Sequence, residues 1–182
     1  MTFTYCPHCG APLADGLKFG RMRRVCRYCG FIHFVEPKVA VAALVSDGAR
    51  VLLVRRAAVP RIGFWALPAG YMDADELPDE AVAREVAEET GMTIRVRGLL
   101  GVAPLAGWVE RRGILVLYQA EPVSGELVAC DDVSEARWFT RAEIPWDELA
   151  FESTAQFLSE WTTTAVAPEK PQGIQRSQKI RK

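Results

Sequence analysis

The sequence of 182 residues lacks the features that would direct it to a membrane, to secretion or to nucleic acid. No apolar run reaches the roughly 20 residues of a membrane span, and no signal-peptide pattern opens the chain. Neither sign of charge dominates, because 22 Lys and Arg oppose 23 Asp and Glu for a net charge of −1. We therefore expect a cytoplasmic protein with no membrane partner, and the charge balance does not favour nucleic acid.

Cysteine is scarce, and four of the five cysteines lie in the first 30 residues. They form two CxxC-Gly motifs, Cys6 to Gly10 and Cys26 to Gly30, a spacing that fits a zinc ribbon. Without a secretory signal, reduced thiols are favoured over disulfides. We predict one structural Zn²⁺, which would supply much of the folding energy of so short a segment, with the ligands Cys6, Cys9, Cys26 and Cys29.

Several roles are compatible with this ribbon. It is locally basic, so it could contact a substrate phosphate, nucleic acid or nothing, or act as a docked stabilising module; its arginines are Arg21, Arg23, Arg24 and Arg27. His8 and His33 are spare candidate ligands, but four cysteines already complete a tetrahedral shell. Cys130 lies beside a predicted strand and is expected to pack rather than bind metal.

The rest of the chain mixes strand and helix signals. Apolar runs predict strands at 39–45, 51–56, 64–70, 94–102, 113–120 and 135–139, with Asp47-Gly48 as a hairpin turn that pairs the first two. Helices are predicted at 78–90 and 146–161. This order favours an α+β fold, an α/β/α sandwich around a mixed sheet. We expect a zinc ribbon over 1–34, a catalytic domain over 35–165 and a disordered basic tail over 166–182.

The helix predicted from Pro78 to Thr90 is the most informative element. Proline suits its first turn, and Gly91 suits a left-handed residue after its last turn. At about 100° per residue, one face is apolar and the other carries four charged residues in a narrow arc: Arg84, Glu85, Glu88 and Glu89. Carboxylates this close repel unless a cation lies between them, and oxygen ligands suit Mg²⁺ or Mn²⁺. A solvated acidic helix face is the alternative.

The surrounding spacing favours the metal site. Gly70, Glu76 and the run from Arg84 to Met92 match G-x5-E-x7-R-E-U-x-E-E-x-G-U at every fixed position, where U is a bulky apolar residue. This stretch resembles the Nudix box. The resemblance implies a Nudix fold with a loop–helix–loop that binds divalent metal and cleaves nucleoside diphosphates linked to a further group.

The resemblance extends over roughly Cys6 to Trp161. The ribbon and the stretches Gly63–Tyr71 and Glu143–Phe151 are similar to zinc-ribbon Nudix hydrolases, a subgroup that includes a plant chloroplast pyrophosphatase for FAD and ADP-ribose. No SQPWPFPQS-like segment of the NADH pyrophosphatases follows the box, and Pro104 is a candidate counterpart of the proline that marks ADP-ribose pyrophosphatases.

The resemblance also implies roles. The divalent metal, Mg²⁺ or Mn²⁺, would be held by Glu85, Glu88 and Glu89, with the Gly70 carbonyl as a further ligand. Arg84 would orient the box by pairing with Glu76 or Glu85. The general base is a box glutamate, Asp132 or Glu135, and for the last two a solvated loop is the alternative.

Several residues outside the box are candidates for substrate binding. Guanidinium groups suit bidentate phosphate contacts, which makes Arg55, Arg56 and Arg61 candidate diphosphate ligands. Aromatic rings could stack on an adenine or flavin, or could simply fill the core; the candidates are Trp65, Tyr71 and Trp108.

Three functions follow from these observations. We expect a pyrophosphatase that cleaves FAD or ADP-ribose and releases AMP, with NADH as the alternative substrate. A nucleotide-sensing or nucleic-acid-binding Nudix regulator is the alternative from another class, although a binder has no need of the complete set of box acids. The partner is a small nucleotide, and a homodimer is left open.

Overall fold

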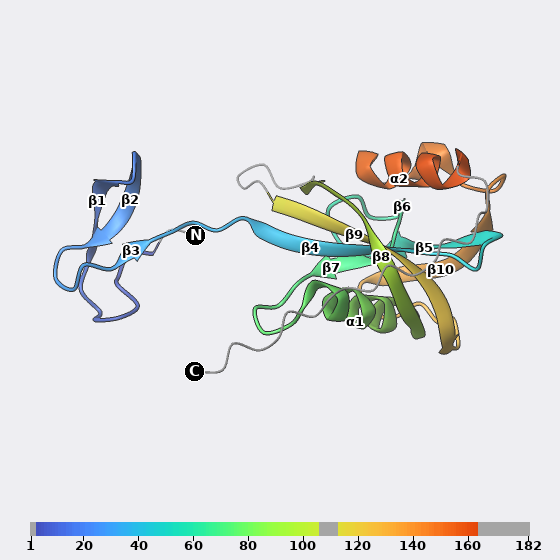
Figure 1. The fold of residues 1–182 in the computed structure, drawn as a ribbon, viewed down its shortest axis with the longest axis horizontal. Helices are drawn as coiled ribbons and strands as arrows, with labels where there is room; N and C mark the ends of the chain where they lie inside the picture. The colour runs from blue at the N-terminus through green and yellow to red at the C-terminus, as the bar shows by residue number, and fades with distance from the viewer. Residues whose placement is uncertain (1–2, 106–112, 164–182) are drawn as a thin grey trace. The chain divides into compact units, whose positions relative to one another are not determined.

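The computed structural model describes residues 3–105 and 113–163. It divides the chain into two compact units, residues 1–37 and 38–182. Figure 1 follows the chain through both units. The basic tail expected over 166–182 and the candidate Trp108 lie outside the described residues.

The first unit is a small antiparallel sheet. Its strands are β1 (Leu13–Lys18), β2 (Arg21–Cys26) and β3 (Ile32–His33), in the order β1-β2-β3. Its core is correspondingly small, because it consists of the buried Cys6, Leu13 and Cys26 with Ala11 and Phe31 packed against them. So little apolar burial supports the expectation that this unit needs a further stabilising element.

The second unit contains two sheets. One has the order β7-β4-β9-β8 and is mixed, since β4 pairs with β9 in parallel while the other pairs are antiparallel. Its strands are β4 (Lys38–Val45), β7 (Ala69–Tyr71), β8 (Met92–Leu105) and β9 (Gly113–Gly125). The other sheet has the order β10-β5-β6, with β5 (Arg50–Arg56), β6 (Trp65–Ala66) and β10 (Val133–Thr140).

One sequence-based pairing was wrong. A turn forms at Asp47-Gly48, where the Asp47 N–H bonds to the Arg50 carbonyl, but the pairing of the flanking strands stops at a single bridge between Ser46 and Val51. Beyond it, β4 and β5 belong to different sheets. Both strands are buried along most of their length, and such apolar runs carry no signal for which neighbour they take.

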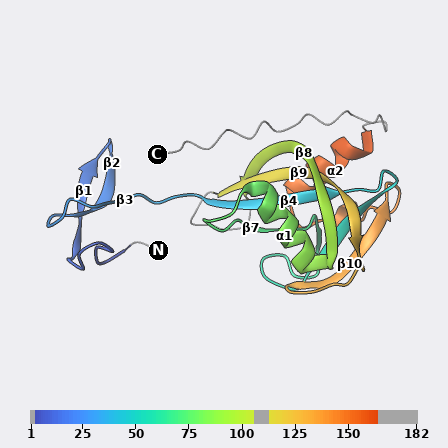
Figure 2. The ribbon, with the colours of Figure 1, turned by 60° about the horizontal axis from the view of Figure 1, so that its bottom comes forward.

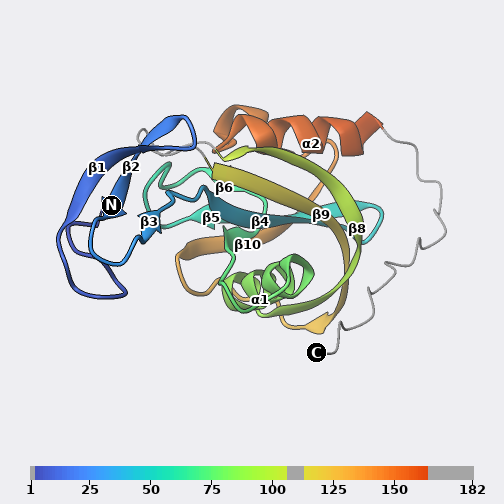
Figure 3. The same cartoon turned by 60° about the vertical axis from the view of Figure 1, so that its left-hand side comes forward.

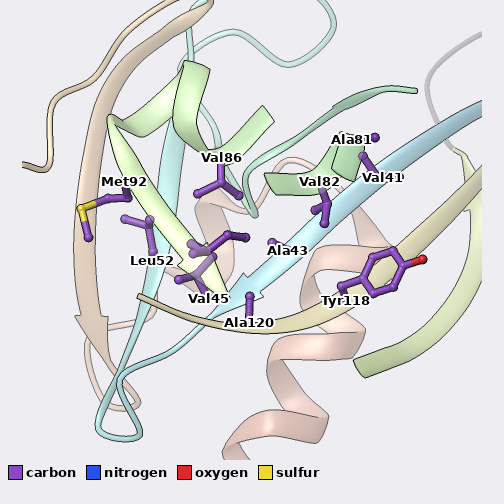
Figure 4. Packing of buried hydrophobic residues seen from close by; sticks show 11 residues of the cluster. Val41, Ala43, Val45, Leu52, Ala81, Val82, Val86, Met92, Tyr118 and Ala120 are labelled. Carbon is purple, nitrogen blue, oxygen red and sulfur yellow. The ribbon is translucent and has the colours of Figure 1, made fainter. Parts of the chain in front are cut away.

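The helix α1 (Pro78–Thr90) has the predicted bounds. Gly91 ends it at φ 68°, where its N–H bonds to the Ala87 carbonyl and a Cβ would lie 2.7 Å from the Glu126 carbonyl oxygen. The apolar face of α1 packs on the four-stranded sheet (Figure 4), through Ala81, Val82 and Val86 against Val41, Ala43 and Val45. The charged residues of the helix lie outside this apolar cluster.

The second helix, α2 (Glu152–Thr163), lies on the opposite side of the strands from α1 (Figures 1 and 3). Its Phe157 and Leu158 pack in a second apolar cluster with Leu44, Leu53 and Phe139. The expected α/β/α sandwich with a mixed sheet is therefore confirmed, and Figure 2 shows the strands between the two helices from another side. Neither described helix is long and apolar enough to cross a membrane.

The start of the last helix differs from the prediction. The segment expected to be helical from Trp146 forms a short 3₁₀ turn, Trp146–Glu148, and α2 begins only at Glu152. Between them the Ala150 N–H donates to the Trp65 carbonyl at 2.7 Å. This hydrogen bond ties an extended backbone to β6, a tertiary contact that overrides local helix propensity.

Candidate active site

The short segment between β6 and β7 brings Gly70 against the charged face of α1. It crosses from one sheet to the other, because β6 pairs with β5 and β7 pairs with β4. A Cβ added at Gly70 would lie 2.1 Å from the carboxyl carbon of Glu85. Glycine is thus the residue that allows the strand backbone and this carboxylate to share the same space.

The carboxylate of Glu89 is the most deeply buried of the three box acids on α1. The residue is 3% exposed, and its Oε2 accepts the Ala69 N–H at 3.0 Å. Burial raises the pKa of Glu89 to about 8, with the charges of Asp132 and Glu85 adding to the shift. The pKa of Glu85 is also raised, again chiefly by burial. In both acids burial disfavours the charged form, and a nearby cation would offset this cost.

Arg84 links the box acids into one network. Its guanidinium donates to both carboxylate oxygens of Glu76, at 3.0 and 2.6 Å, and also to Glu85 at 2.8 Å and to Glu88 at 3.0 Å. The bonds from Arg84 and from the Asp73 N–H lower the pKa of Glu76 to about 2. Arg84 therefore pairs with both partners that the resemblance implied, and with Glu88 as well.

The donor chemistry of this face fits a hard divalent cation. Glu85, Glu88 and Glu89 offer oxygen atoms only, and they range from exposed Glu88 to buried Glu89. Two partly or fully desolvated carboxylates with raised pKa values are an unfavourable arrangement that an Mg²⁺ or Mn²⁺ ion would relieve. The roles of these residues as ligands stay predictions.

A cavity of about 210 Å³ opens beside Gly70. Its walls are mostly apolar, with polar atoms at Arg56, Tyr71 and Asp132, and it is lined further by Leu105, Leu117 and Phe157 from three other elements. A small apolar cavity with a few convergent polar groups is typical of a ligand site. The cavity and the acid cluster meet at Ala69 and Gly70, so a ligand in the cavity would lie next to the box.

The two candidate bases outside the box differ in their surroundings. Asp132 lines the cavity, and its charge acts on Glu89. Glu135, on β10, is half-exposed and pairs with Arg55 at 3.6 Å. The structure thus brings Asp132 to the box and places Glu135 in an ion pair instead.

Backbone bonds fix the loop that carries Asp132. The N–H groups of Val128 and Cys130 donate to the carbonyls of Thr90 and Glu89 at the end of α1, both at 3.0 Å, and the Asp132 carbonyl accepts the Ala57 N–H at 2.7 Å. Cys130, expected to pack, is exposed. Its part in the loop is its backbone rather than its side chain.

The three candidate phosphate ligands are not equally available. Arg56 lines the cavity, although its Nε donates to the Pro60 carbonyl at 2.8 Å. Arg55 bonds to the Gly63 carbonyl at 2.8 Å and pairs with Glu135. Arg61 is exposed, lies over the Phe64 ring and does not line the cavity. Of the three, Arg56 is the one that the structure brings to the site.

The two described aromatic candidates differ in whether they reach the cavity. Trp65 is 4% exposed and packs edge-on against Phe139 at 4.9 Å, so its indole belongs to the core. Tyr71 is 40% exposed, lines the cavity and lies under the Lys38 ammonium group at 5.2 Å. Sequence reasoning did not single out Phe151, whose ring lies in the cavity wall beneath Arg56. Its position depends on the extended segment before α2, which no local signal predicts.

The cysteines of the first unit form a separate cluster that could hold a metal ion. Their four sulfur atoms lie within 4.8 Å of one another, with Cys6 and Cys29 at 3.6 Å and Cys9 and Cys26 at 3.5 Å. A tetrahedron of thiolates around zinc, with Zn–S bonds of about 2.3 Å, has edges of roughly 3.8 Å. The two motifs are also alike in backbone, since Gly10 and Gly30 donate to the carbonyls of Cys6 and Cys26. The cluster fits Zn²⁺.

Comparison with known proteins agrees with this geometry. A family model described as the NUDIX domain matches residues 36–161. An ADP-ribose pyrophosphatase from Methanocaldococcus jannaschii is 35% identical over 120 residues, which cover 65% of this chain and 70% of that protein. An NAD-capped RNA hydrolase, NudC, from Stutzerimonas stutzeri is 30% identical over 86% of this chain; the chain spans 54% of its length.

Solved structures show the same fold. A NUDIX hydrolase from Nitrosomonas europaea superposes with a TM-score of 0.77 at 29% identity, covering 87% of this chain and 92% of its own. A bifunctional NMN adenylyltransferase/ADP-ribose pyrophosphatase from Francisella tularensis, in complex with AMP and a manganese ion, has a TM-score of 0.61 at 27% identity and covers 71% of this chain and 42% of its own. With a family model over most of its length and the complete box from Gly70 to Met92, the chain belongs to the NUDIX family of hydrolases.

Proposed function

We propose that this chain is a metal-dependent pyrophosphatase that hydrolyses ADP-ribose to AMP and ribose 5-phosphate. The observation that carries the proposal is the meeting of the acid cluster of α1 with an apolar cavity at Gly70. A diphosphate bound across this junction would place its P–O–P linkage at the acids and its nucleoside in the cavity. One water molecule is consumed, and each product keeps one phosphate.

Each part of the site has a role in this reaction. A bound divalent cation supplies charge neutralisation at the diphosphate and lowers the pKa of an attacking water. Glu85, Glu88 and Glu89 hold the cation, and Arg84 keeps the first two in place through its bonds to both. The Ala69 N–H orients Glu89. Asp132 or a box glutamate accepts the proton of the water, which is general base catalysis.

The cavity suits the adenosine half of the substrate. Tyr71 and Phe151 offer aromatic surface, and the apolar walls would exclude water from a purine ring. Arg56 is the candidate phosphate ligand. The relatives from M. jannaschii and F. tularensis carry ADP-ribose pyrophosphatase in their names, which supports this choice of substrate.

Other substrates remain to be compared with ADP-ribose. FAD stays a prediction from the sequence, and NADH shares the same AMP half. NAD-capped RNA is a second candidate, because relatives named for this activity match up to 86% of the chain. A structural Zn²⁺ in the first unit and a cytoplasmic location complete the proposal.

The test is a panel of kcat/KM values for ADP-ribose, FAD, NADH, NAD-capped RNA and a diadenosine polyphosphate, with Mg²⁺ and then Mn²⁺. We expect ADP-ribose to be hydrolysed fastest, with AMP as a product. If kcat/KM for NADH, the capped RNA or the polyphosphate exceeded that for ADP-ribose by more than about tenfold under both metals, the proposal of ADP-ribose as the substrate would be wrong. Binding of ADP-ribose with no turnover under either metal would favour the regulator instead.

A further inference from the structure

The near-neutral charge of the chain is the sum of two units with net charges of opposite sign. Residues 1–37 contain five Lys and Arg and two Asp and Glu, so the ribbon carries +3 while the rest of the chain carries −4. The five cations lie within ten residues, Lys18 to Arg27, and no acid interrupts them. The whole-chain balance, which argues against nucleic acid, therefore does not describe the ribbon.

The strand register sorts these cations onto one face. Lys18 lies opposite Arg21, and Gly16 lies opposite Arg23, so their side chains share one side of the β1–β2 hairpin. Arg24 points to the other side, where it pairs with Asp15 at 3.1 Å. Within the described part of the ribbon, no acid pairs with Lys18, Arg21 or Arg23.

Aromatic rings accompany the cations on this face. The rings of Phe19 and Phe34 stack at a centroid distance of 6.2 Å and an interplanar angle of 26°. The Arg23 guanidinium lies over the Phe34 ring at 4.5 Å. We call the surface formed by Lys18, Phe19, Arg21, Arg23 and Phe34 the aromatic–basic face.

The position of Phe19 is unfavourable for folding. Phe19 and Gly20 form the two-residue turn between β1 and β2, and both have positive φ, 51° and 73°. Such turns prefer Asn or Asp before Gly, and a bulky side chain in the left-handed region is an outlier. The Phe19 side chain also gains little from burial, because the residue is 76% exposed. Packing of the ribbon does not explain a phenylalanine here.

We propose that the aromatic–basic face binds single-stranded nucleic acid. Its three cations match a phosphodiester backbone, and its exposed ring and guanidinium offer planar surfaces to unpaired bases. A duplex has its bases already stacked, so it would use the cations alone. This binding site lies within the ribbon and does not rest on the substrate proposed above.

The other side of the same hairpin provides a matched control. Leu17 and Met22 face each other there, and they are 70% and 66% exposed. They offer apolar surface without a ring, beside the Asp15–Arg24 pair. If exposed apolar surface alone promoted binding, this side would contribute as much as the aromatic–basic face.

The experiment measures fluorescence anisotropy of a labelled 12-nucleotide single-stranded RNA with the full-length, zinc-loaded protein, without Mg²⁺, from 50 to 200 mM salt. The matching DNA strand, the duplex and a poly-glutamate peptide are run in parallel. We expect a plot of log Kd against log salt concentration to rise with a slope of about 2, the value for three phosphate contacts on a single strand. The single strands should bind more tightly than the duplex. Comparing the Kd of the RNA strand with that of the DNA strand shows which nucleic acid the face prefers.

Phe19→Asn is the decisive variant. Asparagine suits the left-handed turn, so the fold and the zinc content should be kept while the ring is lost. Binding should weaken by about five- to 150-fold, the usual loss for one base-stacking ring. Leu17→Ala should bind like the parent, and both variants should hydrolyse small substrates at the parent rate.

Several outcomes would overturn the proposal. They are Phe19→Asn binding as tightly as the parent, Leu17→Ala losing as much as Phe19→Asn, and the duplex or the acidic peptide binding more tightly than the single strands. The peptide result would assign the face to an acidic protein partner. A parent Kd above about 1 mM at 50 mM salt would contradict it too.

Discussion

The α-carbon of Gly70 lies directly against the carboxylate of Glu85, so closely that a Cβ at Gly70 would lie only 2.1 Å from the carboxyl carbon. This contact joins the strand that borders the cavity to the helix that carries the acids. Activity should therefore depend on the absence of a side chain at residue 70.

Gly70→Ala should lower kcat/KM by about hundredfold while the protein still folds. The added methyl group would push Glu85 aside, and a displacement of about 1 Å at a catalytic group can cost this much. Circular dichroism and steady-state kinetics are the measurements. Gly98→Ala is the control, because a Cβ there meets no atom within 4 Å. Parent-like activity of Gly70→Ala would show that Glu85 need not hold its position.

Glu88→Gln and Glu89→Gln should each abolish turnover and leave the fold intact. Each change keeps the shape of the side chain and removes a charge that the metal site needs. Asp79→Asn, which removes an acid from the first turn of the same helix, is the control. If either box variant kept activity within about tenfold, or ~1.4 kcal/mol of barrier, the ligand assignment would be wrong.

The metal-free protein should lose stability as pH rises from about 5 to 8. An unfolded glutamate has a pKa near 4.5, whereas that of Glu89 is about 8. Between these values the folded state holds a proton that the unfolded state has released. Stability then falls by up to about 1.4 kcal/mol per pH unit.

Thermal unfolding against pH, with and without Mg²⁺, measures this effect. Mg²⁺ should raise Tm more at pH 8 than at pH 6, because the ion requires the ionised carboxylate. Glu89→Gln should remove much of the fall in Tm, whereas Glu88→Gln, at an exposed position, should keep it. An equal pH dependence for Glu89→Gln and the parent would contradict the burial of this charge.

The two acids before and on β10 should differ in their effect on rate. Asp132→Asn should lower kcat by about 30-fold or more, because Asp132 lines the cavity and acts on Glu89. Glu135→Gln should stay within about threefold, since its partner is Arg55 at a surface position. The pH profile of kcat should lose its acidic limb only in the variant that removes the base. The reverse order of the two effects would assign the base to Glu135.

Metal analysis of the purified protein should find one zinc per chain. The four sulfur atoms are already close enough for a shared ion, and the ribbon has little other core. Cys9→Ser should lose the zinc and unfold the ribbon but keep pyrophosphatase activity, and Cys130→Ser should change neither. A disulfide among these cysteines in freshly isolated protein would refute the zinc site.

The sequence predicted those parts of the molecule that local chemistry determines. Pro78 and Gly91 fixed the ends of α1, and the repeat of its apolar residues placed the acids on one face. The partners of β4 and β5 could not be predicted, because strands buried on both sides carry no alternation to set their neighbours. The cavity depends on Tyr71, Leu105 and Phe151, which are distant in sequence. Trp65 was ambiguous because a buried and a stacking indole look alike in a sequence.

The hydrogen bonds from Val128 and Cys130 to the end of α1 have a consequence for how such an enzyme can diversify. They set the number of residues between the helix and Asp132, so an insertion there would separate the acid from the box. The turn at Asp47-Gly48 has no such tie to the site and can change length freely. Among related chains, differences in substrate preference should therefore appear as substitutions in the cavity wall. Insertions and deletions should occur in turns that are not tied to the site, such as the one at Asp47-Gly48.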